Sequence, residues 1–161
     1  MKYKFYITNF YNVRNLAPNQ VPFSTAIWDP AWFHDFHQDQ NYWFFDKRGV
    51  INGLRAEMLN PSSIDNHCGQ CGHTLYSPYY CPFLRDYRNY LEKLGKRNLD
   101  RMIEHLESVA ERMCFINHAM AQCEVVLLVH EKEDNPCSER SVICEWFRAN
   151  GYEINELTFN K

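Results

Sequence analysis

The sequence lacks the long hydrophobic run that a membrane-spanning helix requires. Its longest aliphatic run, residues 125–129 (VVLLV), is far shorter than the roughly 20 residues needed to cross a bilayer. A signal peptide is not expected either, because Thr8, Asn9 and Asn12 interrupt the apolar segment that would have to follow the N-terminal lysines. We therefore expect an intracellular, cytoplasmic protein without a membrane partner.

A strong net charge and the common catalytic motifs are also absent. The net charge of −3 gives no general attraction to nucleic acid or to anionic membranes. The sequence has no nucleophile elbow, no EF-hand loop, no dinucleotide fingerprint and no P-loop. It has no internal repeat and no low-complexity stretch. The chain of 161 residues is therefore predicted to form a single domain over residues 1–161.

Seven cysteines are present, and an odd number argues against a framework made only of disulfides. Cys68 and Cys71 have the spacing with which two thiolates grip one zinc ion. Cys81 and His73, or His67 in place of His73, could complete a tetrahedral site. We predict zinc as a structural cofactor in a Cys/His-rich loop over residues 60–81. The alternative is a loop of reduced cysteines without metal.

Hydrophobic patterns indicate an α/β fold. The aliphatic run at 125–129 is typical of a central parallel strand that is buried on both faces. A helical pattern begins at Pro82, is interrupted at Gly95 and resumes over the next residues. A helix is expected after the strand at 125–129, and Gly151 would end it before a returning strand, which makes a β-α-β unit. The apolar stripe of this helix comprises Val142, Ile143, Trp146 and Phe147. We predict a mostly parallel sheet flanked by helices in Rossmann-like layers, with strands at 3–8, 21–27, 125–129 and 152–157.

Aromatic residues are concentrated in the first third of the chain. They cannot all fill one core so close together in the sequence, and exposed aromatic clusters usually mark interfaces. We expect some of them to line a ligand groove or a contact in a homo-oligomer; the alternative is a core with an aromatic cover. The cluster comprises Trp28, Trp32, Phe33, Trp43, Phe44 and Phe45.

The candidate ligand site is the predicted strand-to-helix junction at residues 131–140. Ligands of open parallel sheets bind beyond the carboxyl ends of the strands. Asn135 and Pro136 predict an N-cap and a first helical residue, which puts Cys137, Ser138 and Arg140 in the first turn. The free backbone N–H groups of such a turn bind anions and favour a cysteine thiolate. The alternative is a capped helix with a buried thiol and a surface arginine.

Each residue of this junction has a predicted role. Arg140 could hold a phosphate or carboxylate through two hydrogen bonds. Cys137 could act as a nucleophile, or orient the ligand. Glu131, at the strand end, could act as a general base or bind a ribose hydroxyl.

At these residues the chain resembles the bacterial and phage domain-of-unknown-function family numbered 488. The matching text is VVLLVHE followed by PCSER and SVICEWFRANG, where Glu131, Cys137 and Arg140 correspond to the family's motif. A Ser-Glu pair stands where the family has a histidine, which puts histidine-dependent acid–base chemistry in question. The N-terminal segments YITNFYNVRNL and VPFSTAIWDPAWF are also similar, and the match there is carried by Thr8, Asn9, Ser24, Pro30 and Trp32.

The resemblance implies an α/β fold and a link to nucleotides or nucleic acid, without implying a reaction. Together with the junction, it leads us to expect a phosphate-bearing or nucleotide-like small ligand. The predicted ligand-binding residues are Thr8, Asn9, Tyr11, Ser24, Trp28, Trp32, Ser138 and Arg140.

Three functions are compatible with these features. The protein could be an enzyme that uses Cys137, Glu131 and Arg140. It could instead be a non-catalytic binder that sequesters a nucleotide-like signal, as a phage-encoded sponge would. The third function is a zinc-stabilised interaction module. We favour the handling of a small ligand over the third function and leave the choice between enzyme and binder open.

Overall fold

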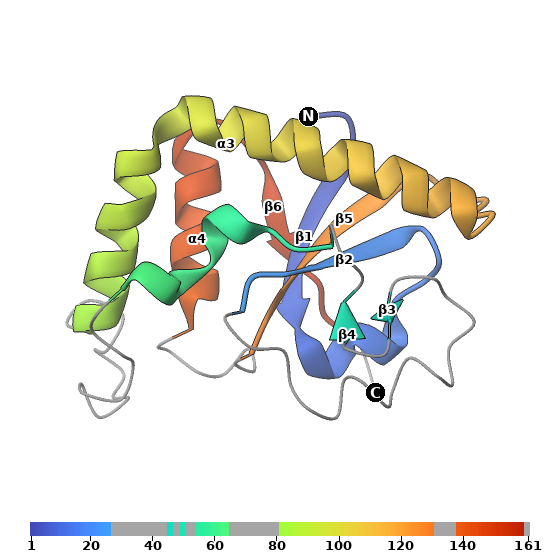
Figure 1. Ribbon diagram of the computed structural model, residues 1–161, viewed down its shortest axis with the longest axis horizontal. Coiled ribbons are helices and arrows are strands. Elements are labelled where there is room, and N and C mark those ends of the chain that lie inside the picture. The colour runs from blue at the N-terminus through green and yellow to red at the C-terminus, as the bar shows by residue number, and fades with distance from the viewer. Residues whose placement is uncertain (27–44, 47–48, 51–53, 65–80, 131–137, 160–161) are drawn as a thin grey trace.

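A computed structural model describes residues 1–26, 45–46, 49–50, 54–64, 81–130 and 138–159. Four parallel strands form the main sheet in the order β2-β5-β1-β6 (Figure 1). Their bounds are Lys4–Asn9 for β1, Gln20–Ser24 for β2, Glu124–Val129 for β5 and Ile154–Glu156 for β6. The predicted α/β class with a parallel sheet is therefore confirmed.

Strand β5 lies at the centre of the core. It pairs in parallel with β2 on one side and with β1 on the other, and its five residues from Val125 to Val129 are fully buried. Its neighbour β1 is also internal, between β5 and β6. A strand that packs on both faces needs apolar side chains at every position, so the run without alternation is explained. The prediction of a central buried strand is confirmed.

Short elements surround the sheet. The 3-10 helix η1 (Phe10–Asn15) follows β1 directly. The strands β3 (Phe45–Asp46) and β4 (Gly49–Val50) pair with each other in an antiparallel manner. Two further 3-10 helices, η3 (Glu57–Leu59) and η4 (Pro61–Ser63), precede the long helix. A parallel bridge between Ser24 and Arg55 extends the pairing beyond β2.

Helix α3 (Pro82–Ile116) consists of two helical segments that meet at Gly95. Gly95 has φ 74° and ψ 173°, a backbone conformation that is almost restricted to glycine. Figure 1 shows the resulting bend, after which the second segment runs across the sheet. Asn98 donates its side-chain Nδ2 to the Leu94 carbonyl at 2.7 Å and so satisfies a group exposed by the bend. The predicted interruption at Gly95 is confirmed.

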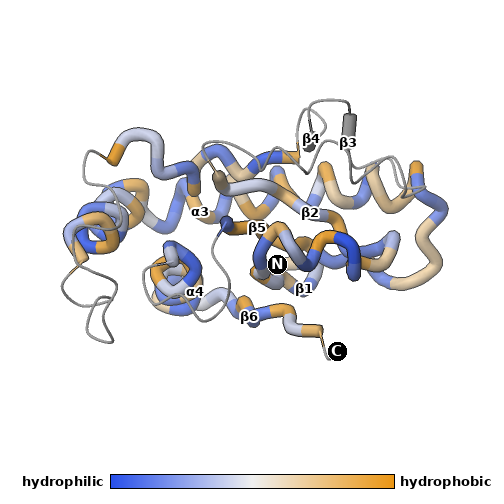
Figure 2. The backbone as a smooth tube through the Cα atoms, turned by 90° about the horizontal axis from the view of Figure 1, so that it is seen from below, coloured by the Kyte–Doolittle hydropathy of each residue, from blue (hydrophilic) through white to orange (hydrophobic). Residues whose placement is uncertain are grey.

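Helix α4 (Glu139–Ala149) packs against α3 and precedes β6. Its apolar stripe is buried as predicted, and α3 and α4 carry both hydrophobic and hydrophilic residues around their turns (Figure 2). Gly151 follows the helix with φ 85°, as expected for a residue after a helix C-terminus. The chain then returns as β6, in parallel with β1, so the predicted β-α-β unit is confirmed.

Some predictions concern residues that the structure does not describe. The Cys/His-rich loop at 60–81 falls largely on residues 65–80, which lie outside the described residues. The Rossmann-like layering and the single domain over residues 1–161 stay predictions. In the described part of the chain, none of the helices combines the length and the apolar character needed to span a bilayer.

The bend in α3 leads to a test of stability. Gly95→Ala adds a Cβ that would meet no atom within 4 Å, so its cost comes from the backbone conformation alone. We expect the free energy of unfolding to fall by about 1–3 kcal/mol in denaturant titrations. Lys93→Ala, at an exposed position of the same helix, is the control and should change it by less than about 0.5 kcal/mol. Equal stabilities of the two variants would contradict the assigned backbone conformation.

Candidate functional site at the carboxyl edge of the sheet

The carboxyl ends of all four parallel strands lie at one edge of the sheet. The strands end at Asn9, Ser24, Val129 and Glu156. The connection leaving β1 passes β5 to reach β2, whereas the connection leaving β5 passes β1 to reach β6. The two connections therefore run in opposite directions from adjacent strands. Such a reversal is where open α/β sheets bind their ligands.

Buried polar side chains are concentrated at this edge. Of the eight polar or charged residues that are buried in the described part of the chain, seven lie at or just beyond the carboxyl ends of the strands. The eighth is Glu107, which lies on α3. Burying polar groups costs free energy unless they are hydrogen-bonded, so their concentration at one edge marks it as different from the rest of the core. The seven are Thr8, Asn9, Ser24, Thr25, Ser138, Glu139 and Arg140.

Short-range hydrogen bonds order the strand ends. The Thr8 hydroxyl accepts a hydrogen bond from Asn12 Nδ2 at 2.8 Å, which ties the end of β1 to η1. The Thr25 hydroxyl donates to the Leu128 carbonyl at 2.9 Å, and the same carbonyl accepts the Thr25 backbone N–H at 3.1 Å. The edge formed by β1, β2 and β5 is thus held in place by its own side chains.

His130 is the first residue beyond β5 and is exposed. Its ring lies 5.2 Å from that of Phe10, centroid to centroid, with an angle of 49° between the planes. Phe10 itself is fully buried and follows the last residue of β1. The contact therefore places an imidazole at the junction of β1 and β5, where the two connections diverge. An imidazole can donate to a phosphate or accept from a hydroxyl group.

The N-terminus of α4 lies at the same edge. Its N-cap is Ser138, whose hydroxyl accepts the backbone N–H of Arg140 at 3.2 Å. The predicted N-cap at Asn135 is therefore wrong: the helix begins at Glu139, and Cys137 precedes its N-cap in the sequence. Serine and asparagine side chains cap a helix N-terminus about equally well. The sequence therefore could not decide between Asn135 and Ser138 as the N-cap.

Arg140 is buried, with 4% of its surface exposed. Its Nε lies 3.1 Å from Oε1 of Glu156, the last residue of β6. Glu156 is about half exposed, so the ion pair reaches from the interior to the surface of the edge. This pairing joins α4 to β6 and fixes the direction of the guanidinium. The alternative of a surface arginine is wrong, because Arg140 is buried.

The structure brings five of the predicted site residues together at the carboxyl edge: Thr8, Asn9, Ser24, Ser138 and Arg140. Tyr11 is exposed on η1, one residue beyond Phe10. Cys81 is buried at the N-cap position of α3. The other predicted residues lie outside the described ones: Trp28, Trp32, Glu131 and Cys137 for the ligand or catalysis, and Cys68, Cys71 and His73 for zinc.

Zinc binding therefore stays a prediction. Among the residues that the structure describes, no group of three or more His, Cys, Asp or Glu side chains could hold a metal ion.

Four residues of the edge were not predicted from the sequence: Thr25, His130, Glu139 and Glu156. His130 could have been found by its position directly after the aliphatic run, and Thr25 by its position next to Ser24. Glu156 carried no local signal, because its partner Arg140 lies 16 residues earlier and on another element.

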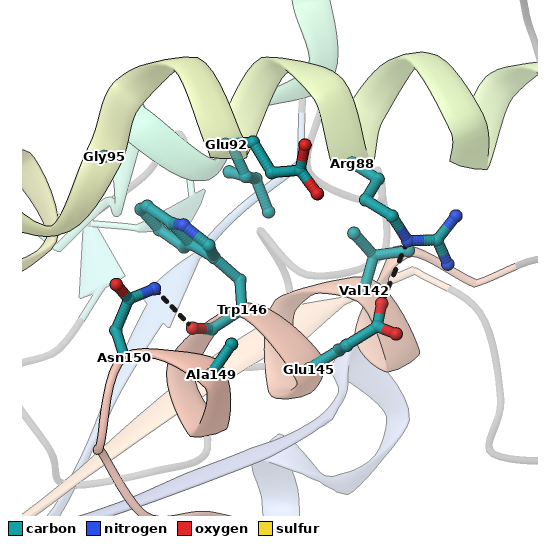
Figure 3. Close-up of a pocket in the computed structure, with 9 residues that line it drawn as sticks. Arg88, Glu92, Gly95, Val142, Glu145, Trp146, Ala149 and Asn150 are labelled. Carbon is teal, nitrogen blue, oxygen red and sulfur yellow. Dashed lines mark hydrogen bonds and ion pairs between the residues drawn. The ribbon is translucent and has the colours of Figure 1, made fainter.

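A separate cavity of about 370 Å³ lies between α3 and α4 (Figure 3). Its floor is apolar, and the ion pair of Arg88 Nε with Glu145 Oε2 at 3.0 Å crosses one side. Trp146 and Glu92 point toward it from the two helices. None of the predicted site residues lines this cavity. We therefore take the carboxyl edge as the candidate site.

Comparisons with known proteins give no match: no family model matches the chain, and neither does any curated protein or solved structure. The resemblance to the family numbered 488 stays a prediction. The geometry of the carboxyl edge is therefore the basis for a proposed function.

The N-cap of α4 can be tested directly. Ser138→Ala removes the hydroxyl that accepts the Arg140 N–H and should lower the free energy of unfolding by about 1 kcal/mol. Lys93→Ala, at an exposed position of α3, is the control and should change it by less than about 0.5 kcal/mol. Chemical denaturation followed by circular dichroism measures both. If Ser138→Ala is as stable as the control, the helix does not begin where the structure has it.

Proposed function

We propose that this protein binds a phosphate-bearing or nucleotide-like small molecule at the carboxyl edge of its parallel sheet. The observation that carries the proposal is the concentration of buried polar side chains there: seven of the eight in the described part of the chain. Open α/β sheets use this edge, at the reversal of their connections, to bind ligands.

The chemistry of the edge favours an anion with hydroxyl groups. The N-terminus of α4 supplies a positive dipole end, and the Arg140 guanidinium adds a positive charge beside it. Glu156 partly neutralises that charge, so a ligand phosphate would compete with a half-exposed carboxylate for the guanidinium. The hydroxyls of Thr8 and Ser24 and the imidazole of His130 could bind sugar hydroxyls.

Binding can be tested by the thermal stability of the protein in the presence of ADP. A ligand that binds only the folded state raises Tm, so ADP should raise it and adenosine, which lacks phosphate, should raise it less. His130→Ala and Arg140→Lys should each reduce the shift. Arg140→Lys keeps a charge opposite Glu156 but removes the planar fork that binds two oxygens of a phosphate.

Arg112→Ala is the matched control, because it removes an exposed positive charge near the C-terminal end of α3. The shift with ADP should persist in this variant. The proposal is wrong if ADP, AMP and inorganic phosphate all leave Tm unchanged. It is also wrong if the shift is the same in His130→Ala, Arg140→Lys and the wild type.

Two further variants separate an enzyme from a binder. In an enzyme, Glu131→Gln and Cys137→Ser would abolish the conversion of the bound nucleotide while the thermal shift remains. A non-catalytic binder would return the nucleotide unchanged from incubation with the wild type, as chromatography of the small-molecule fraction would show.

A further inference from the structure

Two cysteine thiols come together where α3 ends and β5 begins. Cys114 lies in the last turn of α3, and Cys123 is the residue before β5. Asn19 brings the two together. Its carbonyl oxygen accepts from the Cys114 thiol, with Cys114 Sγ 3.6 Å away, and from the Glu124 N–H at 2.8 Å, and its side chain donates to the Gln122 carbonyl at 2.7 Å, so both neighbours of Cys123 in the chain are bonded to the residue that Cys114 contacts. The intervening loop folds back on the helix, since the Ala119 N–H donates to the Cys114 carbonyl at 2.9 Å. Both thiols are free.

The two thiols differ in exposure and in acidity. Cys114 is partly exposed, whereas Cys123 is buried. The hydrogen bond from Cys123 lowers the pKa of Cys114, while the same hydrogen bond and burial raise the pKa of Cys123. Cys114 is therefore the thiol that ionises first and that solvent reaches. Its thiolate would be stabilised by a neighbour that keeps its proton.

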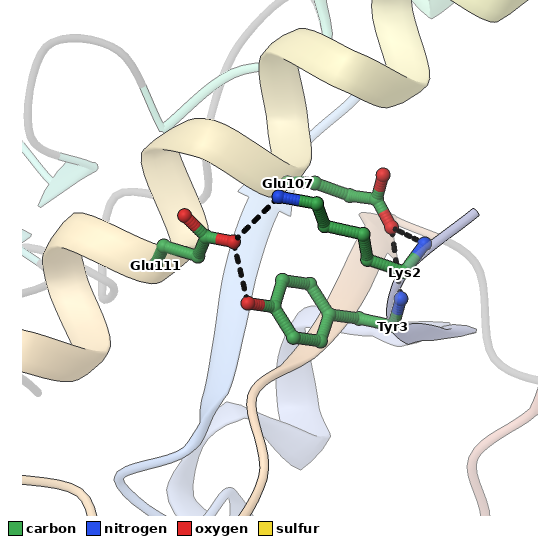
Figure 4. Close-up of polar contacts among 4 residues, drawn as sticks. All are labelled: Lys2, Tyr3, Glu107 and Glu111. Carbon is green, nitrogen blue, oxygen red and sulfur yellow. Dashed lines mark hydrogen bonds and ion pairs between the residues drawn. The ribbon is translucent and has the colours of Figure 1, made fainter.

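About one turn before Cys114 on α3, Glu111 contacts Lys2 and Tyr3 of the N-terminal segment (Figure 4). Glu111 accepts hydrogen bonds from the Tyr3 hydroxyl at 2.5 Å and from Lys2 Nζ at 3.4 Å. These partners lower the pKa of Glu111, and the hydrogen bond to Glu111 in turn raises the pKa of Tyr3 to about 12. The Glu111 charge opposes ionisation of Cys114, but Lys2 and Tyr3 hold the carboxylate in their own hydrogen bonds.

We propose that Cys114 and Cys123 form an oxidative modification site, at which a hydroperoxide converts the two thiols into an intramolecular disulfide. The Cys114 thiolate attacks one peroxide oxygen, the O–O bond breaks, and the departing oxygen takes up a proton as an alcohol, or as water from hydrogen peroxide. Cys114 is then a sulfenic acid. The Cys123 sulfur attacks the Cys114 sulfur, the S–O bond breaks, and the hydroxide leaves with the Cys123 proton as water. The two thiols supply the two electrons that reduce the peroxide.

The other described cysteines have no comparable arrangement. Burial raises the pKa of Cys144 on α4 to about 11, so little thiolate is present near neutral pH. Cys81 is buried at the start of α3. A disulfide between Cys114 and Cys123 would tie the last turn of α3 to the beginning of the central strand. It would also fix the loop after α3, which presents the highly exposed side chain of Met120.

The experiment uses the full chain treated with hydrogen peroxide, then alkylated with iodoacetamide in denaturant and digested with trypsin. Cleavage after Arg112 and Lys132 leaves both thiols in one peptide, residues 113–132. We expect this peptide to lose two hydrogen atoms and to take up no alkyl group, as measured by mass spectrometry. Cys144, which lies in a different peptide, should remain alkylated and so serves as an internal control.

Variants test the order of the steps. Cys123→Ser should retain the reactive thiol and accumulate a sulfenic acid at Cys114, which dimedone traps. Cys114→Ser should leave Cys123 reduced, and Cys144→Ser should form the disulfide like the wild type. The wild type is also compared with protein unfolded in guanidinium chloride, which controls for reaction within a short flexible peptide.

Native protein should form the disulfide faster than unfolded protein, because in the fold Cys114 and both chain neighbours of Cys123 are bonded to Asn19. The proposal is overturned if the native rate is no higher, or if both thiols are still alkylated after peroxide treatment. It is also overturned if dimedone labels Cys123 rather than Cys114 in the single variants. None of these outcomes depends on ligand binding at the opposite edge of the sheet.

Discussion

The burial of β5 on both sides is the constraint on which the rest of the structure depends. A strand with neighbours on both edges and packing on both faces leaves no position for a polar side chain along its buried part, Val125 to Val129. Polar groups can then enter the interior only where the strands end and the chain turns. The concentration of hydroxyls, amide and guanidinium at the carboxyl edge follows from this exclusion.

The same constraint explains why much of the fold could be predicted. The run VVLLV has no alternation, and together with the helical periodicity on each side it indicated a parallel α/β arrangement. Gly95 and Gly151 both adopt positive φ, where the sequence placed breaks between elements. The exact start of α4 was missed, because Asn135-Pro136 and Ser138 are both reasonable beginnings of a helix. Only the capping hydrogen bond from Arg140 N–H to Ser138 distinguishes them.

Only part of the candidate site could be predicted from the sequence. Residues at strand ends, such as Thr8, Asn9 and Ser24, could be named because their position follows from the strands. The pairing of Arg140 with Glu156 could not, since it depends on β6 lying beside β1 and beneath the start of α4. Burial of the Arg140 guanidinium also depends on contacts between elements, so it could not be predicted from the sequence either. A guanidinium held by a carboxylate is better oriented than one on the surface, but it must exchange partners to bind a phosphate.

The contact between Glu107 and the N-terminal backbone has a consequence for the mechanics of the fold. This buried carboxylate accepts the backbone N–H groups of Lys2 and Tyr3, at 2.5 and 2.8 Å, immediately before β1 begins. The second segment of α3 is thereby attached to the residues that directly precede an internal strand. The long helix and the sheet cannot slide past each other without breaking two hydrogen bonds to a charge. Trimming the first three residues, or forcing them aside with a rigid fusion, would strand that charge in the interior and loosen the helix from the strand that it covers.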